Sequence, residues 1–415
     1  MYVIGLLILI ATIYFVLKRY EIRTVLIASG LLMTIIALEP NTAFEAFANR
    51  MTTGGLIQAI LSVLAFAHVM KLTKCDQHLI HLLGNGLKKV RPILVPGAVL
   101  ATFAINIALP SAAGASAAVG AVFIPVLMAA GIHPALAGAA VLSGTFGSML
   151  NPGLSHNPFI AELAGVEVLE VIAVHSTASI VAGIIGAIAL TVVGIIRKEL
   201  KGHEFELEQE DDFKVNVIKA LVVVIPLALL VLGATEVIPP LAELSIPGAM
   251  LIGAILGMAV TKTNPFEVTK TFFDGMGSAY SSVMGIIIAA AVFVAGLQAL
   301  GVIDALIDAM INFEAIAGVA GTFGPFLLAV ISGSGDAAAF AFNEAITPFA
   351  EQFGFGTIEL GSIAALAGAL GRTMSPVAAA TIVCAGYAQV NPVELAKRTA
   401  PGMIIATIVA MIILL

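Results

Sequence analysis

Long apolar runs separated by short basic segments dominate this chain and leave it one class of fold. The runs approach the length of about 20 residues that a helix needs to cross the hydrocarbon of a bilayer. They cover residues 1–17, 22–38, 54–71, 173–196, 215–233, 245–261, 281–300 and 400–415. Charged residues make up only 11% of the sequence and hydrophobic residues 60%. A soluble fold could not cover so much apolar surface, so we predict an all-α polytopic membrane protein.

The lysine and arginine residues predict its orientation, because cytoplasmic loops hold these residues in excess. An N-terminus outside the membrane places all 19 basic residues on the cytoplasmic side, except Arg50 outside and Arg372 at membrane depth. This works only if two broken apolar regions, 92–172 and 313–390, each hold a re-entrant hairpin and one crossing helix. Both termini are then predicted to lie outside.

The two broken regions also resemble each other weakly. Matching residues, offset by 223 or 224 positions, are Ser111 with Ser334, Pro125 with Pro348, Gly147 with Gly371, and Pro152 with Pro376. The charge distribution gives the first hairpin a cytoplasmic base and the second an external base, so the repeats are predicted to be inverted. Inverted repeats with broken helices are typical of secondary transporters, whose binding sites form at the helix breaks.

We therefore expect two inverted-topology repeats, each with about five transmembrane helices, one of them broken, plus one re-entrant hairpin. The first repeat, 1–196, would comprise a scaffold (1–71), an interfacial arm (75–90), a hairpin (92–131) and a broken helix (134–172). A polar cytoplasmic linker, 197–214, would follow. The second repeat, 215–415, would comprise a scaffold (215–300), a hairpin (313–351) and a broken helix (357–390). A second amphipathic segment, 263–280, is also predicted to lie along the cytoplasmic surface.

Small and polar residues gather at the two hairpin tips and the two breaks, where unwound backbone can bind ions. The residues predicted to bind substrate are Ser111, Ala112, Ala113, Gly114, Ser148, Asn151, Pro152, Ser334, Gly335, Arg372, Thr373, Ser375 and Pro376. Close helix packing is the competing explanation for any one of the small residues. The four clusters together favour a binding site.

Ionisable residues at membrane depth are costly and indicate a functional site by default. Asp336 is the most informative of them, since it could ligate Na⁺, carry a proton or pair with Arg372. The planar guanidinium of Arg372 also suits a substrate carboxylate. A Na⁺ site is one alternative, near Ser332, Gly333 and Asp336. No other cofactor or metal is expected.

Three further residues are weaker candidates for cation or proton coupling. Glu344, two helical turns after Asp336, either lines a cation path or extends toward the outer surface, and Asn343 is similar. His156 follows the first break and could carry a proton, although a lone histidine more often bonds a helix end.

Four segments of the second half resemble a known family. They are AVFVAGLQALGVID (291–304), SGSGDAAAFAFNEAITP (332–348), GRTMSPV (371–377) and NPVELAKRTAP (391–401), with a looser match through SAAGASAAVGAVFIPVLMAAGI in the first half. This pattern is similar to that of the DcuC-type anaerobic C4-dicarboxylate carriers, within the ion transporter superfamily. Two departures touch the tips and breaks: Asp336 stands where the family has an amide, and residues 155–157 differ.

The resemblance implies transport of succinate, fumarate and malate across a bacterial inner membrane. It further implies an elevator mechanism, a homodimer, and coupling to Na⁺, H⁺ or counter-substrate. The matching tips and breaks would form the substrate site.

Other functions remain alternatives. A cation/proton antiporter of the same architecture would use Asp336 and Glu344 for its cations, and a carrier of another organic anion would use the same site. Residues 333–336 match the G-x-G-D pattern of intramembrane aspartyl proteases, but no Tyr-Asp pair accompanies them, so an enzyme is not expected. The chain lacks a basic patch with interleaved aromatic residues, so nucleic acid is not an expected partner.

Overall fold

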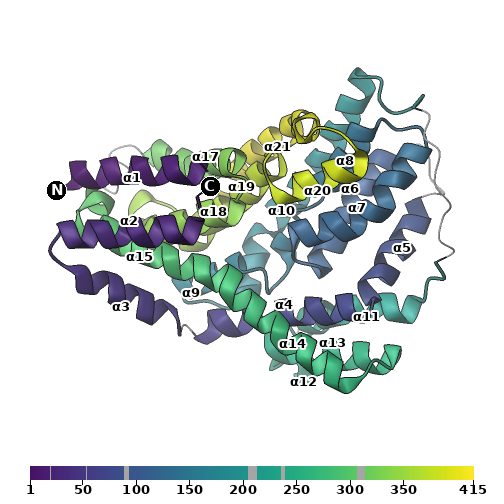
Figure 1. Cartoon of the computed structure of the whole chain (residues 1–415), viewed down its shortest axis with the longest axis horizontal. Helices are drawn as coiled ribbons and strands as arrows, with labels where there is room; N and C mark the ends of the chain where they lie inside the picture. The colour runs from purple at the N-terminus through teal and green to yellow at the C-terminus, as the bar shows by residue number, and fades with distance from the viewer. Residues whose placement is uncertain (19, 53, 88–92, 204–212, 235–238, 306–313) are drawn as a thin grey trace.

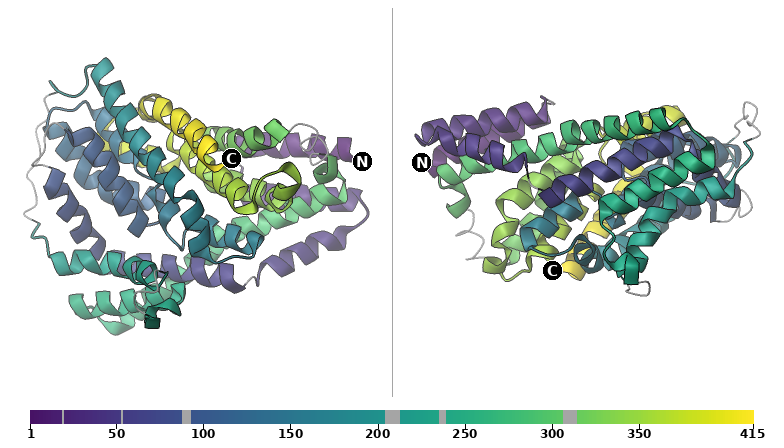
Figure 2. Two further views of the ribbon diagram at one scale, coloured as in Figure 1. Left: turned by 180° about the vertical axis from the view of Figure 1, so that it is seen from behind. Right: turned by 90° about the horizontal axis from the view of Figure 1, so that it is seen from below.

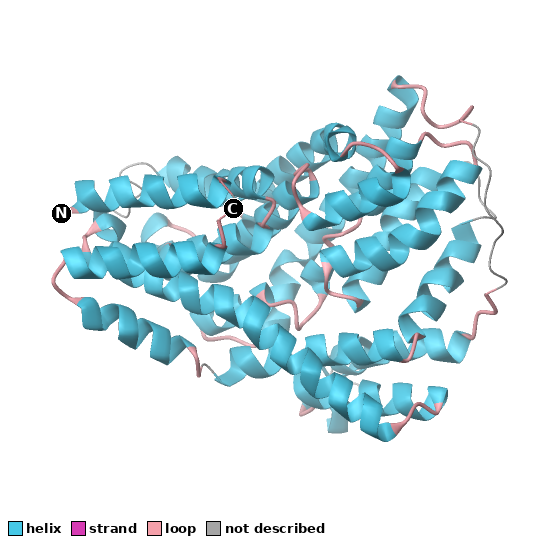
Figure 3. Cartoon of the chain, viewed as in Figure 1, coloured by secondary structure: helices cyan, strands magenta, loops and turns pink. Residues whose placement is uncertain are grey.

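The computed structural model describes residues 1–18, 20–52, 54–87, 93–203, 213–234, 239–305 and 314–415. Every regular element in these ranges is a helix (Figure 3), so the prediction of an all-α protein is confirmed. Residues 204–212 of the predicted linker and 88–90 of the predicted arm lie outside the described ranges.

The first half contains helices on both sides of an irregular region at 144–155. They are α1 (Tyr2–Leu17), α2 (Ile22–Ile36), α3 (Pro40–Arg50), α4 (Gly54–Leu72), α5 (Cys75–Leu87), α6 (Leu94–Ala108), α7 (Ala112–Ala129), α8 (Pro134–Ser143), a 3₁₀ turn (Gly147–Leu150), α9 (His156–Ala164) and α10 (Val168–Ile196).

The second half has a similar succession of elements, with an irregular region at 374–378. They are α11 (Val217–Ala234), α12 (Pro239–Ala242), α13 (Ile246–Thr261), α14 (Pro265–Ala279), a π-helical turn (Tyr280–Met284), α15 (Gly285–Ala299), α17 (Glu314–Ser332), α18 (Gly335–Ala345), a 3₁₀ turn (Thr347–Phe353), α19 (Thr357–Thr373), α20 (Ala379–Ala388) and α21 (Pro392–Leu414).

Within the described part, four helices are long and apolar enough to cross a membrane. They are α7, the 29-residue α10, the continuous 35-residue stretch Pro265–Ala299, and α21. The pair α4 and α5, bent by 78° at its break, adds a fifth if it forms one span. Most of the other predicted spans are apolar helices of 10–17 residues.

The segment 263–280 is continuous with the helix that follows it, because α14 runs through the π-helical turn into α15 as one long helix. Its position along the cytoplasmic surface stays a prediction. Gly275 allows α14 to pack closely on α4, since a Cβ there would be 2.8 Å from Cα of Ala65. A glycine that looks like a helix breaker thus permits close contact between two helices.

Helices α10 and α21 pack against each other in the middle of the molecule and contribute to both of its large hydrophobic cores. Figures 1 and 2 show α1–α3 at one end with α15 and α17, and α5–α8 at the other end. Arg398 of α21, 3% exposed, forms an ion pair with Glu199, just after α10. The helices next to the two irregular regions, α8, α9, α19 and α20, each contact α10 or α21, so they are held by elements from both halves of the sequence.

Candidate functional site

The two predicted hairpin tips are short turns with the same local structure. Helices α6 and α7 contact each other across residues 109–111, and α17 and α18 do so across residues 333–334. Ser111 Oγ accepts a hydrogen bond from the N–H of Gly114 at 3.1 Å, and Ser334 Oγ accepts one from Ala337 at 3.3 Å. Each serine therefore caps the helix that follows it, as serine favours at this position.

The other predicted residues at the tips belong to these turns. Ala112, Ala113 and Gly114 form the first turn of α7, and Gly335 begins α18. Ser332 Oγ donates to the carbonyl of Leu328 at 2.6 Å and accepts from the N–H of Ser334 at 3.2 Å. Gly333 has a φ of +79°, a conformation that glycine adopts at little cost.

The first break is tied to the end of α6 by two amide side chains. Asn106 Oδ1 accepts from the N–H of Ser148 at 2.9 Å, and its Nδ2 donates to the carbonyl of Leu109 at 2.9 Å. Asn151 Nδ2 donates to the carbonyl of Ile107 at 2.6 Å. The structure thus brings Ser148, Asn151 and the neighbouring Pro152 beside the first tip. Sequence reasoning missed Asn106, although a lone amide in an apolar helix was the available signal.

A second buried network holds the far side of the same break. Asn157 Nδ2 donates to the carbonyls of Met149 and Asn151, at 2.8 and 2.9 Å. Its Oδ1 lies 3.0 Å from His175 Nε2, and His175 Nδ1 lies 3.1 Å from Ser179 Oγ. Because buried polar groups are costly unless paired, this chain of bonds fixes the unwound backbone of the break. Sequence reasoning also missed Asn157 and His175.

Asp336 and His156 come from the two halves of the chain, 180 residues apart in sequence. His156 Nε2 lies 3.0 Å from Asp336 Oδ1, and the imidazole stacks on Phe340 with ring centroids 4.4 Å apart. The histidine side chain is 3% exposed, whereas that of Asp336 is 58% exposed. The pair is therefore anchored on the histidine side and open on the carboxylate side.

Arg372 connects the second break with the first. Its Nη2 donates to the carbonyl of Thr145 at 2.9 Å, while its buried Nη1 has no hydrogen-bond partner in the described part of the chain. We considered Arg372 as the partner of Asp336, but the ion pair of Asp336 in the structure is with His156. One donor of Arg372 thus remains available to a ligand.

The remaining predicted residues of the second break form local bonds. Thr373 Oγ1 donates to the carbonyl of Ala369 at 2.8 Å, and Ser375 Oγ accepts from the N–H of Val377 at 3.4 Å. Thr381 Oγ1 donates to the carbonyl of Ser375 at 2.7 Å, and Pro376 follows in the same irregular segment. These contacts hold the backbone of the break in shape.

Glu344 and Asn343 lie further along α18 and have partners of their own. Arg50, at the end of α3, places Nη2 2.5 Å from both carboxylate oxygens of Glu344 and Nη1 2.6 Å from Glu162. Asn343 Nδ2 donates to the carbonyl of Gly361 at 3.2 Å, and its Oδ1 accepts from Thr347 at 2.9 Å. Sequence reasoning did not anticipate Arg50 as a partner, and a coupling role for Glu344 stays a prediction.

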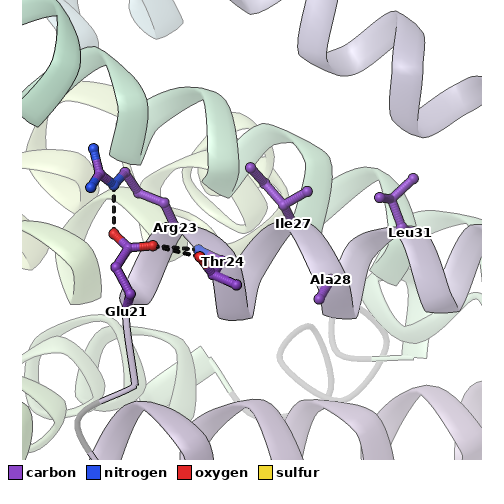
Figure 4. Close-up of a pocket in the computed structure, with 6 residues that line it drawn as sticks. All are labelled: Glu21, Arg23, Thr24, Ile27, Ala28 and Leu31. Carbon is purple, nitrogen blue, oxygen red and sulfur yellow. Dashed lines mark hydrogen bonds and ion pairs between the residues drawn. The ribbon is translucent and has the colours of Figure 1, made fainter.

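A surface pocket on α2, drawn in Figure 4, contains none of the residues of the tips or breaks. Its lining residues are Glu21, Arg23, Thr24, Ile27, Ala28 and Leu31. Burial alone would raise the pKa of Glu21, but hydrogen bonds from Arg23 and Thr24 outweigh it and lower the pKa to about 2. The carboxylate is thus engaged in capping α2, and we do not assign this pocket to the substrate.

The comparisons with known proteins establish the family. A family model described as C4-dicarboxylate anaerobic carrier, DcuC, matches residues 2–415. The chain belongs to the DcuC family. This confirms the resemblance seen in the four segments of the second half, and it makes the protein a membrane transporter and not an enzyme.

Individual relatives agree with this assignment. A putative uncharacterized transporter of Haemophilus influenzae is 46% identical over 272 residues, covering 63% of this chain and 98% of the relative. The anaerobic C4-dicarboxylate transporter DcuC of Escherichia coli is 26% identical, covering 99% of this chain and 95% of the relative.

A solved structure supports the fold alone. MtrF of Neisseria gonorrhoeae, described as illuminating a class of antimetabolite efflux pumps, superposes with a TM-score of 0.67 at 13% identity. The match covers 92% of this chain and 83% of MtrF.

Proposed function

We propose that this protein is a secondary active transporter of C4-dicarboxylates such as succinate, fumarate and malate in a bacterial inner membrane. The observation that carries the proposal is Arg372, whose buried Nη1 is unpaired among the described residues at the junction of the two breaks. A guanidinium is suited to a carboxylate, and an unpaired buried donor costs free energy until a ligand satisfies it. The family membership favours a dicarboxylate as that ligand.

The second carboxylate would bind at the first tip and break. The hydroxyl hydrogen of Ser111 is available, because its oxygen only accepts from Gly114. The N-terminal end of α7 adds the partial positive charge of its unpaired N–H groups. The amide nitrogen and the amide oxygen of Asn151 are both already hydrogen bonded, so Asn151 would shape this half of the site without binding the substrate.

Larger-scale features of the mechanism are part of the same proposal. Helices α6–α10 and α17–α21 would form a transport domain of two inverted repeats, moving as an elevator against a scaffold built from the other helices. The protein would be a homodimer with both termini outside. A coupling cation would bind beside Asp336, either a proton or Na⁺ held near Ser332 and Gly333. In the described chain no cluster of three His, Cys, Asp or Glu side chains could hold a metal, so a Na⁺ site would need backbone, hydroxyl or amide oxygens beside Asp336.

Uptake of labelled succinate into proteoliposomes tests the proposal. The gradients to compare are Na⁺, pH and internal unlabelled dicarboxylate. We expect at least one of them to accelerate uptake, and the one that does so identifies the coupling. Folded protein that takes up no succinate under any gradient would overturn the proposal.

The cation/proton antiporter is a second candidate, because Asp336 and His156 form a titratable pair whose carboxylate is exposed. The same vesicles separate the two functions. An antiporter would move protons in response to a cation gradient with no organic acid present, whereas the dicarboxylate carrier would require its substrate. Competition by acids of other lengths would reveal a different organic anion.

Replacing Asp336 by asparagine should weaken the cation dependence of uptake more than it changes the substrate range. A hydrogen bond to a charged group contributes about 1.5–3 kcal/mol, so we expect the stimulation by the driving cation to fall by roughly tenfold or more. The order of preference among succinate, fumarate and malate should persist. Asp274→Asn, at an exposed position of α14, is the control. Unchanged Na⁺ and pH dependence in D336N would exclude Asp336 as the coupling residue.

A further inference from the structure

We propose that His156 carries the coupling proton on Nδ1 and that a carboxylate of the bound substrate accepts the hydrogen bond from it. The inference rests on the proposed function and names the coupling ion and the residue that holds it. It follows from the hydrogen bonds of the His156 ring, in which Nε2 has a partner and Nδ1 has none in the described structure.

The contact with Asp336 determines which nitrogen of the neutral ring carries hydrogen. An ionised carboxylate can only accept hydrogen bonds, so His156 Nε2, 3.0 Å from Asp336 Oδ1, must be the donor. In a neutral imidazole the other nitrogen, Nδ1, then carries no hydrogen and can only accept a hydrogen bond. That atom is buried and has no hydrogen-bond partner in the described structure. It is therefore the place where a proton can be added.

A proton on Nδ1 creates a need for an acceptor. The resulting N–H would be a buried, charged donor, and such a group is costly without a partner. A substrate carboxylate supplies the missing oxygen. Binding of the proton and binding of the carboxylate therefore assist each other through a single bond.

The ring is held so that Nδ1 keeps its direction. It stacks on Phe340 with planes 28° apart, and the side chain is 3% exposed. The next residue, Asn157, is fixed by its bonds to the carbonyls of Met149 and Asn151. The carboxylate of Asp336 is 58% exposed, whereas Nδ1 of the ring is buried. The proposal therefore requires protons and the substrate to approach the ring from the side of Asp336.

No neighbouring group in the described chain already satisfies Nδ1. The titratable or charged side chains on α9 and on the elements packed against it are Glu162, Asp336, Glu344, Glu351, Glu359, Arg372, Glu170, His175, His68 and Lys71. Of these, only Asp336 is hydrogen bonded to the ring, and it is bonded through Nε2. Glu162 and Glu344 are paired with Arg50, and both nitrogens of His175 are bonded to other groups.

The charges also favour uptake of the proton with the substrate. Asp336 and Arg372 cancel each other, so a dianion beside a neutral His156 would leave a net charge of −2. Protonation of the ring reduces it to −1, which lowers the cost of carrying the loaded site through the membrane. By linkage, the proton raises the affinity for the dianion as much as the dianion raises the affinity for the proton.

Calorimetric titration of the purified full chain with succinate tests this inference. Titrations in buffers of different ionisation enthalpy give the number of protons taken up per succinate bound. Under conditions where the free ring is neutral, we expect uptake of about one proton, and an affinity that falls up to tenfold per pH unit. His156→Gln should abolish both effects, while its amide can still donate to Asp336. His68→Gln, which removes a histidine of α4 bonded to the carbonyl of Leu64, should retain both.

The outcomes separate the two proposals. Succinate binding by the unaltered protein with no proton uptake and no pH dependence would overturn the role of His156 and leave the transport function standing. Undiminished proton uptake in H156Q would place the proton elsewhere and also overturn it. Folded protein that binds no succinate would overturn both. Since the first and last outcomes need no variant, the test holds even if H156Q does not fold.

Discussion

Replacing Arg372 by glutamine should weaken succinate binding by about two orders of magnitude. Removing one member of a buried, hydrogen-bonded charge pair costs about 2–5 kcal/mol, and about 3 kcal/mol corresponds to roughly a hundredfold in affinity. The replacement removes Nη1, the unpaired donor that would bind the substrate. It also removes the hydrogen bond from Nη2 to the carbonyl of Thr145, which stabilises the first break. Titration calorimetry with succinate measures the effect directly.

Arg372→Lys and Lys397→Gln complete this experiment. Lysine keeps the charge but not the planar pair of donors, so we expect R372K to lie between the unaltered protein and R372Q. Lys397 is exposed and pairs with Glu394 at the start of α21, so its replacement should leave affinity unchanged. A change of less than threefold in folded R372Q would mean that the substrate does not use this guanidinium.

Replacing Gly147 by alanine should destabilise the protein by about 3 kcal/mol, the upper part of the usual range for overpacking. A Cβ at this position would lie 2.0 Å from the carbonyl oxygen of Phe103 in α6, and backbone cannot move aside as a flexible side chain can. Relief would require the first break to shift away from α6. Ser148 and Asn151, whose bonds cross this contact, would then lose their positions. The melting temperature in detergent and the rate of succinate uptake should therefore both be lower than in the unaltered protein.

Gly386→Ala is the matched control for this experiment. It is also a glycine in a helical segment, that of α20, but a Cβ there would meet no atom within 4 Å. Alanine is favoured over glycine inside helices by about 1 kcal/mol, so G386A should be as stable as the unaltered protein or more so. Equal melting temperatures for G147A and G386A would show that the contact with Phe103 is not a constraint.

The positions of the tips and breaks could be predicted from sequence because their chemistry is local. Clusters of proline, glycine and small polar residues interrupt the apolar runs, and those at Ser111, Asn151, Ser334 and Ser375 became turns or irregular segments. A single proline was not enough, since Pro125 lies inside α7. Gly275, for which the sequence alone made no prediction, shows the limit of such local reasoning. Glycine permits either a break or a close helix contact, and only the neighbour, Ala65, determines which one forms.

The side-chain pairs could not be predicted in the same way. Asp336 had one apparent partner in its own half, Arg372, but the residue with which it forms an ion pair is His156 of the other half. Glu344 likewise pairs with Arg50, 294 positions away in sequence. Such pairs depend on how α9, α18 and α3 are brought together, and the hydrophobic pattern of a single helix contains no information about that.

The position of Arg50 has a consequence for the rate of any cycle that moves these helices. Its guanidinium joins α3 to Glu162 of α9 and Glu344 of α18 at the same time. If α9 and α18 travel together past α3, both contacts must separate before each passage, and they add to the activation barrier. Dissolved ions screen exposed pairs more than buried ones, and Glu162 is the more exposed of the two partners, at 31% against 13% for Glu344. Turnover would then accelerate as ionic strength rises, mainly through the contact with Glu162, even at a constant driving gradient. The contacts of Arg50 would then limit the rate of transport, whereas coupling to the driving ion would take place elsewhere, at Asp336 and His156.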